Sequence, residues 1–128
     1  MVTLEVKPIS KISIAGNLNA LVLTNDQTSV SDDNTRYSLT TNIDNMKIVA
    51  SISDQMPAGT NLKVRLSSST ASSNGIVDVS QAVSPVTVVT GIQRGTEIDQ
   101  TISYVFTATT DVRELARTSR SVTFTLTN

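Results

Sequence analysis

The sequence predicts an all-β protein, folded as an antiparallel β-sandwich of about eight or nine short strands. Three observations support this fold class. Val, Ile and Thr, whose branched side chains favour strands over helices, make up about a third of the 128 residues. Apolar and polar residues alternate with a period of two along most of the chain. Turn-forming residues separate these segments at the short spacing that is typical of a sandwich.

The first half of the chain contains five such segments. Residues 1–14 break at Pro8, and each side of the break keeps its apolar alternation. The other strands of this half are predicted at 18–24, 36–41, 46–52 and 61–66. One face of each alternating strand is apolar, so we expect the two sheets to pack on each other through these faces.

The second half shows the clearest alternation. Strands are predicted at 76–79, 85–92, 101–109 and 121–127. In 101–109, apolar side chains face one way and mostly hydroxyl side chains face the other. Residues 111–119 are expected to form the loop before the last strand. Asn74-Gly75 predicts a hairpin, because a type I′ turn needs two residues with positive φ.

The composition excludes several classes of active site. The chain contains no histidine, cysteine or tryptophan, which removes histidine-based triads, cysteine nucleophiles, disulfides and ordinary zinc sites. The net charge is −1, from 10 basic and 11 acidic residues, so a nucleic-acid partner is not expected. We expect one domain over residues 1–128, not an enzyme, with no cofactor and no catalytic or metal-binding residue.

The carboxylates are the remaining acid–base groups. A glycosidase pair would have to come from Glu5, Asp78, Glu97, Asp99 and Glu114, in a cleft that usually also offers aromatic platforms. Only 3% of the residues are aromatic, so we expect no such cleft.

Asp26, Asp32 and Asp33 lie in the polar stretch 24–36. The stretch offers oxygen ligands, but it lacks the spaced pattern of a calcium loop. We expect a solvated surface loop, with calcium binding as the alternative.

A basic cluster precedes the last strand, formed by Arg113, Arg117 and Arg120. We expect a loop that its charges keep soluble. The alternative is contact with an acidic partner or an anionic glycan.

The segment 1–14 has two interpretations. It can be an edge strand that crosses from one sheet to the other at Pro8, since proline has no N–H to donate. It can instead leave its own domain and add to the edge of a neighbour, as a donor strand with alternate side chains in pockets. The side chains that would interlock are Val2, Leu4, Val6, Ile12 and Ile14. Both interpretations require the same alternation.

Several strand and turn motifs between Thr41 and Asn128 resemble a known family. They are Thr41-Asn42, Met46-Lys47-Ile48, Met56-Pro57-Ala58-Gly59-Thr60, Val89-Thr90-Gly91-Ile92, Ile102-Ser103-Tyr104 and Ser121-Val122-Thr123-Phe124-Thr125-Leu126-Thr127. They resemble secreted bacterial β-sandwich surface proteins similar to fimbrial subunits and to spore coat protein U-like domains. The resemblance implies an immunoglobulin-like sandwich, export to the surface and assembly by donor-strand exchange.

Two functions follow as hypotheses. The first is a structural subunit of an extracellular filament, pilus or surface coat, whose partners are copies of itself. The second is a monomeric carbohydrate- or cell-wall-binding module, whose partner is a surface glycan. We expect an extracellular or bacterial cell-surface location, with an export signal that is not in this chain and no membrane insertion, because no apolar run approaches about 20 residues.

Overall fold

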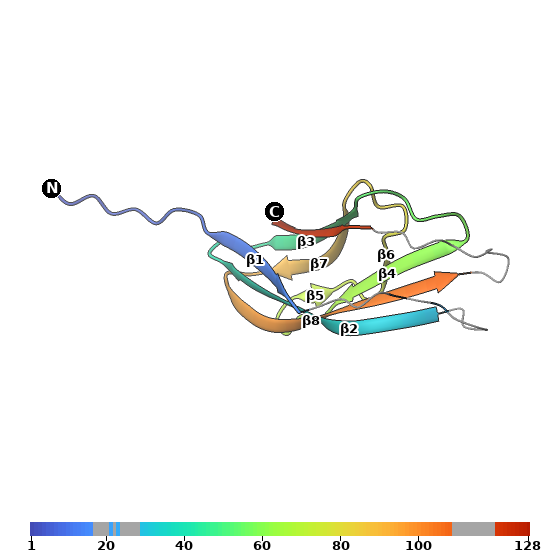
Figure 1. Cartoon of the computed structure of the whole chain (residues 1–128). Helices are drawn as coiled ribbons and strands as arrows, with labels where there is room; N and C mark the ends of the chain where they lie inside the picture. The colour runs from blue at the N-terminus through green and yellow to red at the C-terminus, as the bar shows by residue number, and fades with distance from the viewer. Residues whose placement is uncertain (17–20, 22, 24–28, 109–119) are drawn as a thin grey trace.

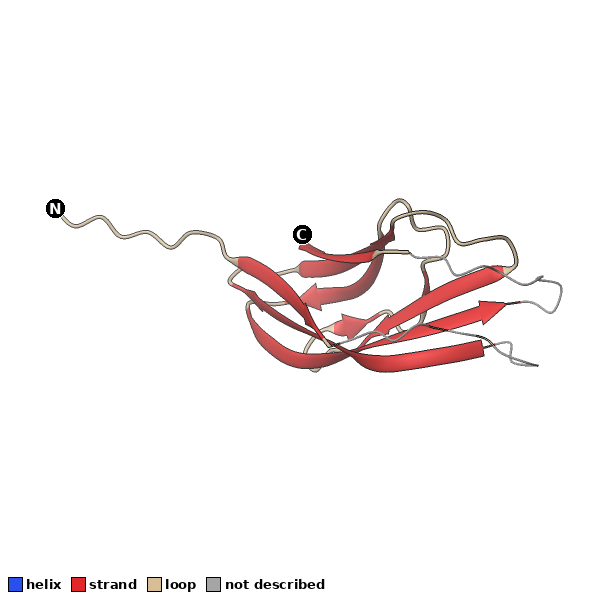
Figure 2. Cartoon of the chain, viewed as in Figure 1, coloured by secondary structure: helices blue, strands red, loops and turns tan. Residues whose placement is uncertain are grey.

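The computed structural model describes residues 1–16, 21, 23, 29–108 and 120–128. Within this part of the chain the protein is all-β, with nine strands, two antiparallel sheets and no helix (Figure 2). In the same residues there is no helical segment with the length and apolarity needed to cross a membrane.

The two sheets differ in size. The five-stranded sheet has the spatial order β1 (Ser10–Ala15), β2 (Ser29–Thr41), β8 (Gly95–Ala108), β4 (Thr60–Leu66) and β6 (Val77–Asp78). The four-stranded sheet has the order β5 (Ser72–Ser73), β7 (Val86–Ile92), β3 (Met46–Ile52) and β9 (Val122–Thr127). The two layers and the strand labels can be followed in Figure 1.

The core lies between the sheets and is built from the alternate residues that the sequence indicates. In β3, Ile48 and Ala50 are fully buried, and in β4, Val64 and Leu66 are at most 1% exposed. β2 adds two buried apolar side chains, and β8 adds Ile102 and Tyr104. The predicted alternation of these strands is therefore confirmed, because each buries its apolar face against the opposite sheet.

Two strands are longer than the sequence predicts. β2 begins at Ser29 and β8 begins at Gly95, and they pair with each other over most of their length. Val30 lies opposite Phe106, and the register shifts between Asp32 and Thr35. The expectation of a surface loop is thus wrong for residues 29–36. A polar segment becomes a strand there because β8 supplies the backbone partners, which local propensity does not reveal.

The predicted hairpin at Asn74-Gly75 is also wrong. β5 before the turn pairs with β7, whereas β6 after it pairs with β4, so the turn links one sheet to the other. Gly75 has a φ of 72°, while the Asn74 side chain donates to the Thr87 carbonyl at 3.1 Å. The Asn74 contact with β7 fixes the chain where it leaves the four-stranded sheet.

The two sides of the sandwich are therefore unlike. On one side, β5 and β6 are the edge strands and the chain between them crosses from sheet to sheet. On the other side, β1 and β9 are the edge strands. β1 and β9 approach each other there without pairing.

Two predicted elements fall largely outside the described residues. Of the predicted strand 18–24, only Leu21 and Leu23 are described, and both are half-buried. Leu21 packs against the core. The predicted loop 111–119 lies entirely outside the described residues.

Candidate assembly site

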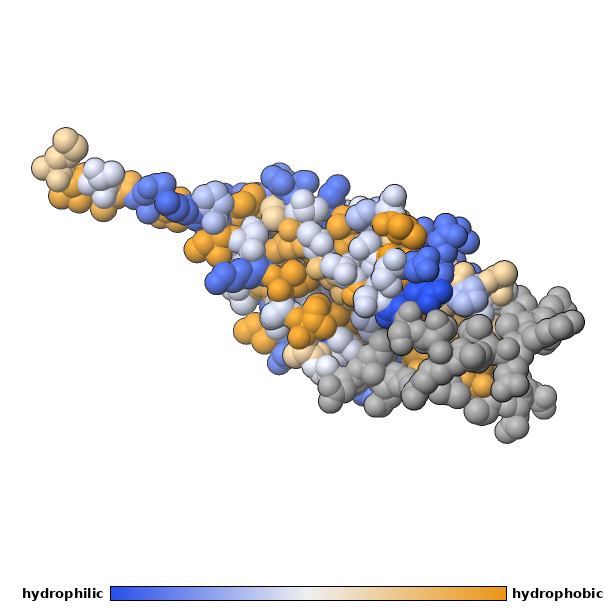
Figure 3. Space-filling model, turned by 45° about the horizontal axis from the view of Figure 1, so that its top comes forward, coloured by the Kyte–Doolittle hydropathy of each residue, from blue (hydrophilic) through white to orange (hydrophobic). Residues whose placement is uncertain are grey.

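Residues 1–9, which we call the arm, lie outside both sheets and extend away from the sandwich (Figure 1). Three of its apolar side chains are almost fully exposed: Val2 at 82%, Leu4 at 88% and Val6 at 85%. They alternate with the polar Thr3 and Glu5. Figure 3 shows apolar and hydrophilic atoms side by side along this segment. Alternating apolar side chains at this exposure are typical of a strand without its sheet.

Asn42 holds the base of the arm. Its side-chain oxygen accepts a hydrogen bond from the Ile9 N–H at 2.8 Å, and its backbone N–H donates to the Ile9 carbonyl at 3.0 Å. Its side-chain N–H donates to the Lys7 carbonyl at 3.0 Å. These three bonds fix the chain on both sides of Pro8, which itself has no N–H. An asparagine after a strand carries no sequence signal for this role, and sequence reasoning did not find it.

The five side chains predicted to interlock divide into two groups. Val2, Leu4 and Val6 lie in the arm, whereas Ile12 and Ile14 lie in β1 and pair with Leu39 and Tyr37 of the same chain. Ile12 is half-buried and Ile14 is 48% exposed. Residues 10–15 therefore form an edge strand of their own sheet, and the arm alone lies outside both sheets.

β9 is the edge of the four-stranded sheet, and its core-facing side chains are incompletely covered. Val122, Phe124 and Leu126 face inward but are only half-buried. Their partners on β3 are Ile52, Ala50 and Ile48, which are 0–3% exposed. Both rows face the same core, so the difference arises because β3 has strands on both sides, whereas within the described part of the chain β9 has a strand on one side only.

The backbone groups of β9 alternate between β3 and the free edge. The Ser53 N–H donates to the Ser121 carbonyl at 2.9 Å, which places the pair 53/121 among the hydrogen-bonded positions. Hydrogen-bonded positions recur every second residue in an antiparallel pair. The odd-numbered residues of β9 thus bond to β3. The N–H and C=O groups of Val122, Phe124 and Leu126 point to the free edge, where a further strand would find them.

The one strongly buried carboxylate among the described residues has a structural task. Glu97 is 5% exposed, and its Oε1 atom accepts five hydrogen bonds from three consecutive residues, Ser68, Ser69 and Thr70. The shortest joins Ser68 Oγ to Oε1 at 2.7 Å. Among the described residues, Oε2 finds no hydrogen-bond partner. Burial raises the pKa of Glu97, but the bonds from Ser68, Thr70 and Ser69 outweigh it and lower the pKa below its ordinary value.

Tyr37 lies near this carboxylate. Its hydroxyl donates a hydrogen bond to the Ser67 carbonyl. Burial first, and the negative charge of Glu97 second, raise the pKa of Tyr37 to about 12. Tyr37 and Glu97 together tie the segment after β4 to β2 and β8, so both stabilise the fold.

The other predicted acidic groups do not converge. Glu5 lies in the arm, Asp78 in β6 and Asp99 in β8, and Glu114 is outside the described residues. Within the described ranges no three acidic side chains are close enough together to hold a metal ion. Asp32 and Asp33 lie in β2 rather than in a loop, and Asp26 is outside the described residues.

The predicted basic cluster is described only at Arg120. Its guanidinium donates to the Gln55 carbonyl at 2.8 Å from Nη2 and at 3.1 Å from Nε. Arg113 and Arg117 lie outside the described residues. Arg120 thus ties the start of the last strand to the chain after β3.

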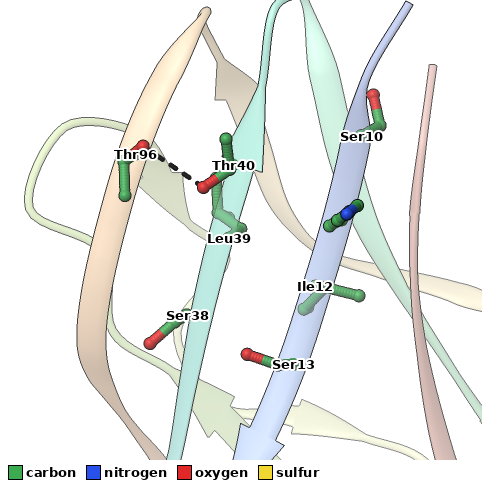
Figure 4. A pocket seen from close by; sticks show the side chains of 8 residues that line it. Ser10, Ile12, Ser13, Ser38, Leu39, Thr40 and Thr96 are labelled. Atoms are coloured by element: carbon green, nitrogen blue, oxygen red, sulfur yellow. Dashed lines mark hydrogen bonds between the residues drawn. The ribbon is translucent and has the colours of Figure 1, made fainter.

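A shallow depression crosses β1, β2 and β8 on the outer face of the five-stranded sheet (Figure 4). It is lined by Ser10, Lys11, Ile12, Ser13, Ser38, Leu39, Thr40 and Thr96. A hydroxyl–hydroxyl hydrogen bond of 3.2 Å joins Thr40 and Thr96 across it. No aromatic side chain lines the depression. All four aromatic residues of the chain, Tyr37, Tyr104, Phe106 and Phe124, belong to the core or pack against it.

The comparisons with known proteins add no relative. No family model, no curated protein and no solved structure matches this chain. The geometry of the arm and of β9 is therefore the basis for inferring the function of this chain.

Proposed function

We propose that the protein is a structural subunit, not an enzyme, of an extracellular filament, pilus or surface coat, and that it assembles by β-strand addition. The observation that carries this proposal is the arm, which exposes Val2, Leu4 and Val6 at 82–88%. Burying an apolar side chain of this size stabilises by about 1.5–3 kcal/mol. Three of them in alternate positions therefore favour a partner that covers one face of the arm.

The free edge of β9 is the receiving site in this proposal. A strand added there would cover Val122, Phe124 and Leu126 and would satisfy the backbone groups of the edge. The arm is long enough, because residues 1–7 extended at about 3.3 Å per residue span about 23 Å and the six residues of β9 span about 20 Å. The three apolar side chains of the arm, Val2, Leu4 and Val6, match in number the three half-buried apolar side chains of β9.

The direction of the arm favours a second copy over the same chain. Lys47 pairs with Thr127, and Ser10 pairs with Thr41, so β9 ends where β1 begins (Figure 1). The arm projects beyond this end of the sandwich. In a head-to-tail row of equally oriented copies, each arm would run along β9 of the copy ahead, antiparallel to it. Such a contact does not close on itself, and repetition builds a filament.

Under this proposal the two sheets form an immunoglobulin-like sandwich, similar to the fimbrial subunits and spore coat protein U-like domains that the sequence resembles. The hydroxyl-rich outer row of β9, Thr123, Thr125 and Thr127, suits a surface that packs against copies of itself with little charge repulsion. The alternative glycan-binding module lacks support, because no aromatic residue is placed to stack on a sugar ring.

The test compares two substitutions in neighbouring arm positions, Leu4→Asp and Thr3→Asp. Sedimentation velocity and negative-stain electron microscopy of the parent chain should reveal assemblies that grow with concentration. Leu4→Asp should remain monomeric, because a carboxylate would have to enter the core of the next copy. Thr3→Asp adds the same charge on the outward face and should still assemble.

Circular dichroism and thermal unfolding provide the control for folding. Both variants should match the parent chain, because the arm lies outside both sheets. A parent chain that stays monomeric at all concentrations would contradict the proposal, as would a Leu4→Asp variant that assembles as well as the parent.

A further inference from the structure

We infer that the arm docks on β9 of the next copy in one register, with Val2 opposite Leu126, Leu4 opposite Phe124 and Val6 opposite Val122, and that Pro8 sets this register. The inference rests on the proposed function and goes beyond it, because strand addition alone does not specify which residues pair. Three structural constraints lead to this register.

The first constraint is the facing of side chains. A shift by one residue would turn Thr3, Glu5 and Lys7 toward the core and Val2, Leu4 and Val6 toward solvent. The charged side chains of Glu5 and Lys7 would then be buried among the apolar side chains of β9, which costs free energy. Only shifts by an even number of residues keep the apolar row of the arm on the core.

The second constraint comes from the backbone. The free N–H and C=O groups belong to Val122, Phe124 and Leu126, as the 53/121 hydrogen bond indicates. In the inferred register these residues face Val6, Leu4 and Val2, each of which has both an N–H and a C=O. Every backbone group of the β9 edge is then paired.

Pro8 is the third constraint. If the arm slid two residues further along β9, Pro8 would face Val122, whose carbonyl would meet no N–H. Val2 would pass beyond β9 to Asn128. If the arm slid two residues back, Val6 would face Arg120, which precedes β9, and would no longer lie on the apolar row of that strand. The inferred register alone uses all three apolar side chains and ends the pairing before Pro8.

In the copy that provides the arm, Asn42 also limits the pairing to the residues before Pro8. It holds the Lys7 carbonyl and both backbone groups of Ile9. The residues available for pairing are therefore those up to Lys7, and in this register Lys7 faces Ser121, one residue before β9 begins. The segment that Asn42 holds in one copy thus meets the beginning of β9 in the next copy, at the junction between the two.

Cysteine pairs test the register, since the chain contains no cysteine of its own. Glu5 and Thr123 face each other at a position without hydrogen bonds, where Cα atoms in antiparallel strands lie about 4.5 Å apart, within disulfide range. Both side chains point away from the core. Under mild oxidation, the double variant Glu5→Cys/Thr123→Cys should form a ladder of disulfide-linked chains.

Two double variants serve as matched controls for the shifted registers. Glu5→Cys/Thr125→Cys corresponds to the arm two residues further along, and Thr3→Cys/Thr123→Cys to the arm two residues back. Each should crosslink at least about tenfold more slowly than Glu5→Cys/Thr123→Cys, because its sulfurs lie on diagonal positions. Sedimentation velocity on the reduced variants measures assembly independently of the disulfide.

The outcomes separate the register from the function. If the variants assemble but one of the two controls crosslinks fastest, the register is wrong and strand addition is still supported. Equal rates in all three variants overturn the register as well. Variants that do not assemble when reduced, or that form a disulfide only within one chain, overturn both.

As a further check, Pro8→Ala should raise the crosslinking rate of Glu5→Cys/Thr125→Cys, because it restores the missing N–H. An unchanged rate would overturn the role of Pro8.

Discussion

The Asn42 side-chain oxygen lies 2.8 Å from the Ile9 nitrogen, and the Asn42 nitrogen lies 3.0 Å from the Ile9 carbonyl oxygen. The two residues thereby close a small ring of hydrogen bonds where the arm leaves the sandwich. The chain before Ile9 is exposed and the chain after it is paired in β1. This contact is the boundary between the part of the chain that folds with its own sheets and the part proposed to fold with a neighbour.

Replacing Asn42 by alanine should loosen the base of the arm without unfolding the sandwich. The Ile9 N–H would lose its acceptor, and the Lys7 carbonyl would lose its donor. We expect amide exchange at Ile9 to become faster, while the free energy of unfolding changes by less than about 1.5 kcal/mol because the site is exposed. Hydrogen exchange followed by NMR measures the first and urea denaturation the second. The exposed Asn128→Ala is the control, and protection of Ile9 that persists in Asn42→Ala would contradict the role of this residue.

Replacing Glu97 by glutamine should destabilise the fold. The glutamine keeps an oxygen for Ser68, Ser69 and Thr70, but it loses the charge that strengthens their five hydrogen bonds, and it buries an N–H₂ group where Oε2 now lies. We expect a loss of about 1–3 kcal/mol in the free energy of unfolding, from urea denaturation at neutral pH. The exposed Asp99→Asn should change it little, because asparagine also adopts the positive φ of 54° found at this position.

Glu97 should also make the fold sensitive to acid. Its pKa in the folded protein lies below the ordinary value of 4.5, so the carboxylate stabilises the fold above pH 4.5 and this contribution is lost as the pH falls through the folded pKa. The free energy of unfolding of the parent chain should therefore decrease as the pH is lowered below 4.5. Glu97→Gln should show a shallower slope, and equal slopes for both proteins would contradict the assignment.

The two tyrosines should resist ionisation as long as the protein is folded. Burial and the charge of Glu97 raise the pKa of Tyr37 to about 12, and burial, then the charge of Asp32, raise the pKa of Tyr104. A raised folded pKa means that Tyr37 contributes stability below its ordinary pKa of 10 and loses it as the pH rises from 10 toward 12. These are the chain's only tyrosines and it has no tryptophan, so ultraviolet absorbance reports on them alone. A tyrosinate signal that rises with an ordinary pKa while circular dichroism remains native would refute this prediction.

A side chain at position 16 should strain the connection after β1. Gly16 has a φ of 99°, and a Cβ atom there would lie 2.4 Å from the Asn34 carbonyl oxygen. Gly16→Ala should therefore destabilise the fold by more than Gly75→Ala, whose φ is 72° but whose Cβ would meet nothing within 4 Å. For Gly75→Ala we expect a loss of about 1–2 kcal/mol from backbone conformation alone. Thermal unfolding of both variants tests the order, and a Gly16→Ala variant as stable as the parent would contradict it.

Much of the strand pattern could be predicted because alternation is local. A residue in a strand faces opposite to its neighbour whatever the strand pairs with. Ile48 and Ala50 of β3, and Val64 and Leu66 of β4, are therefore buried as their positions in the alternation indicate. Turn chemistry was less informative. Asn74-Gly75 indicated a turn, but not whether the strands beside it would pair with each other.

The sequence by itself determined that the protein is all-β and which side chains turn toward the core, since both follow from branched side chains and a period of two. The tertiary structure alone decided the partners: β2 with β8 over most of its length, β5 and β6 in different sheets, Glu97 with the Ser68–Thr70 run, and Asn42 with Ile9. It also separated Val2, Leu4 and Val6 from Ile12 and Ile14, although the same alternation runs through both groups. The physical reason is that a strand becomes part of a sheet only when distant backbone groups satisfy its own, and alternation carries no information about which groups those are.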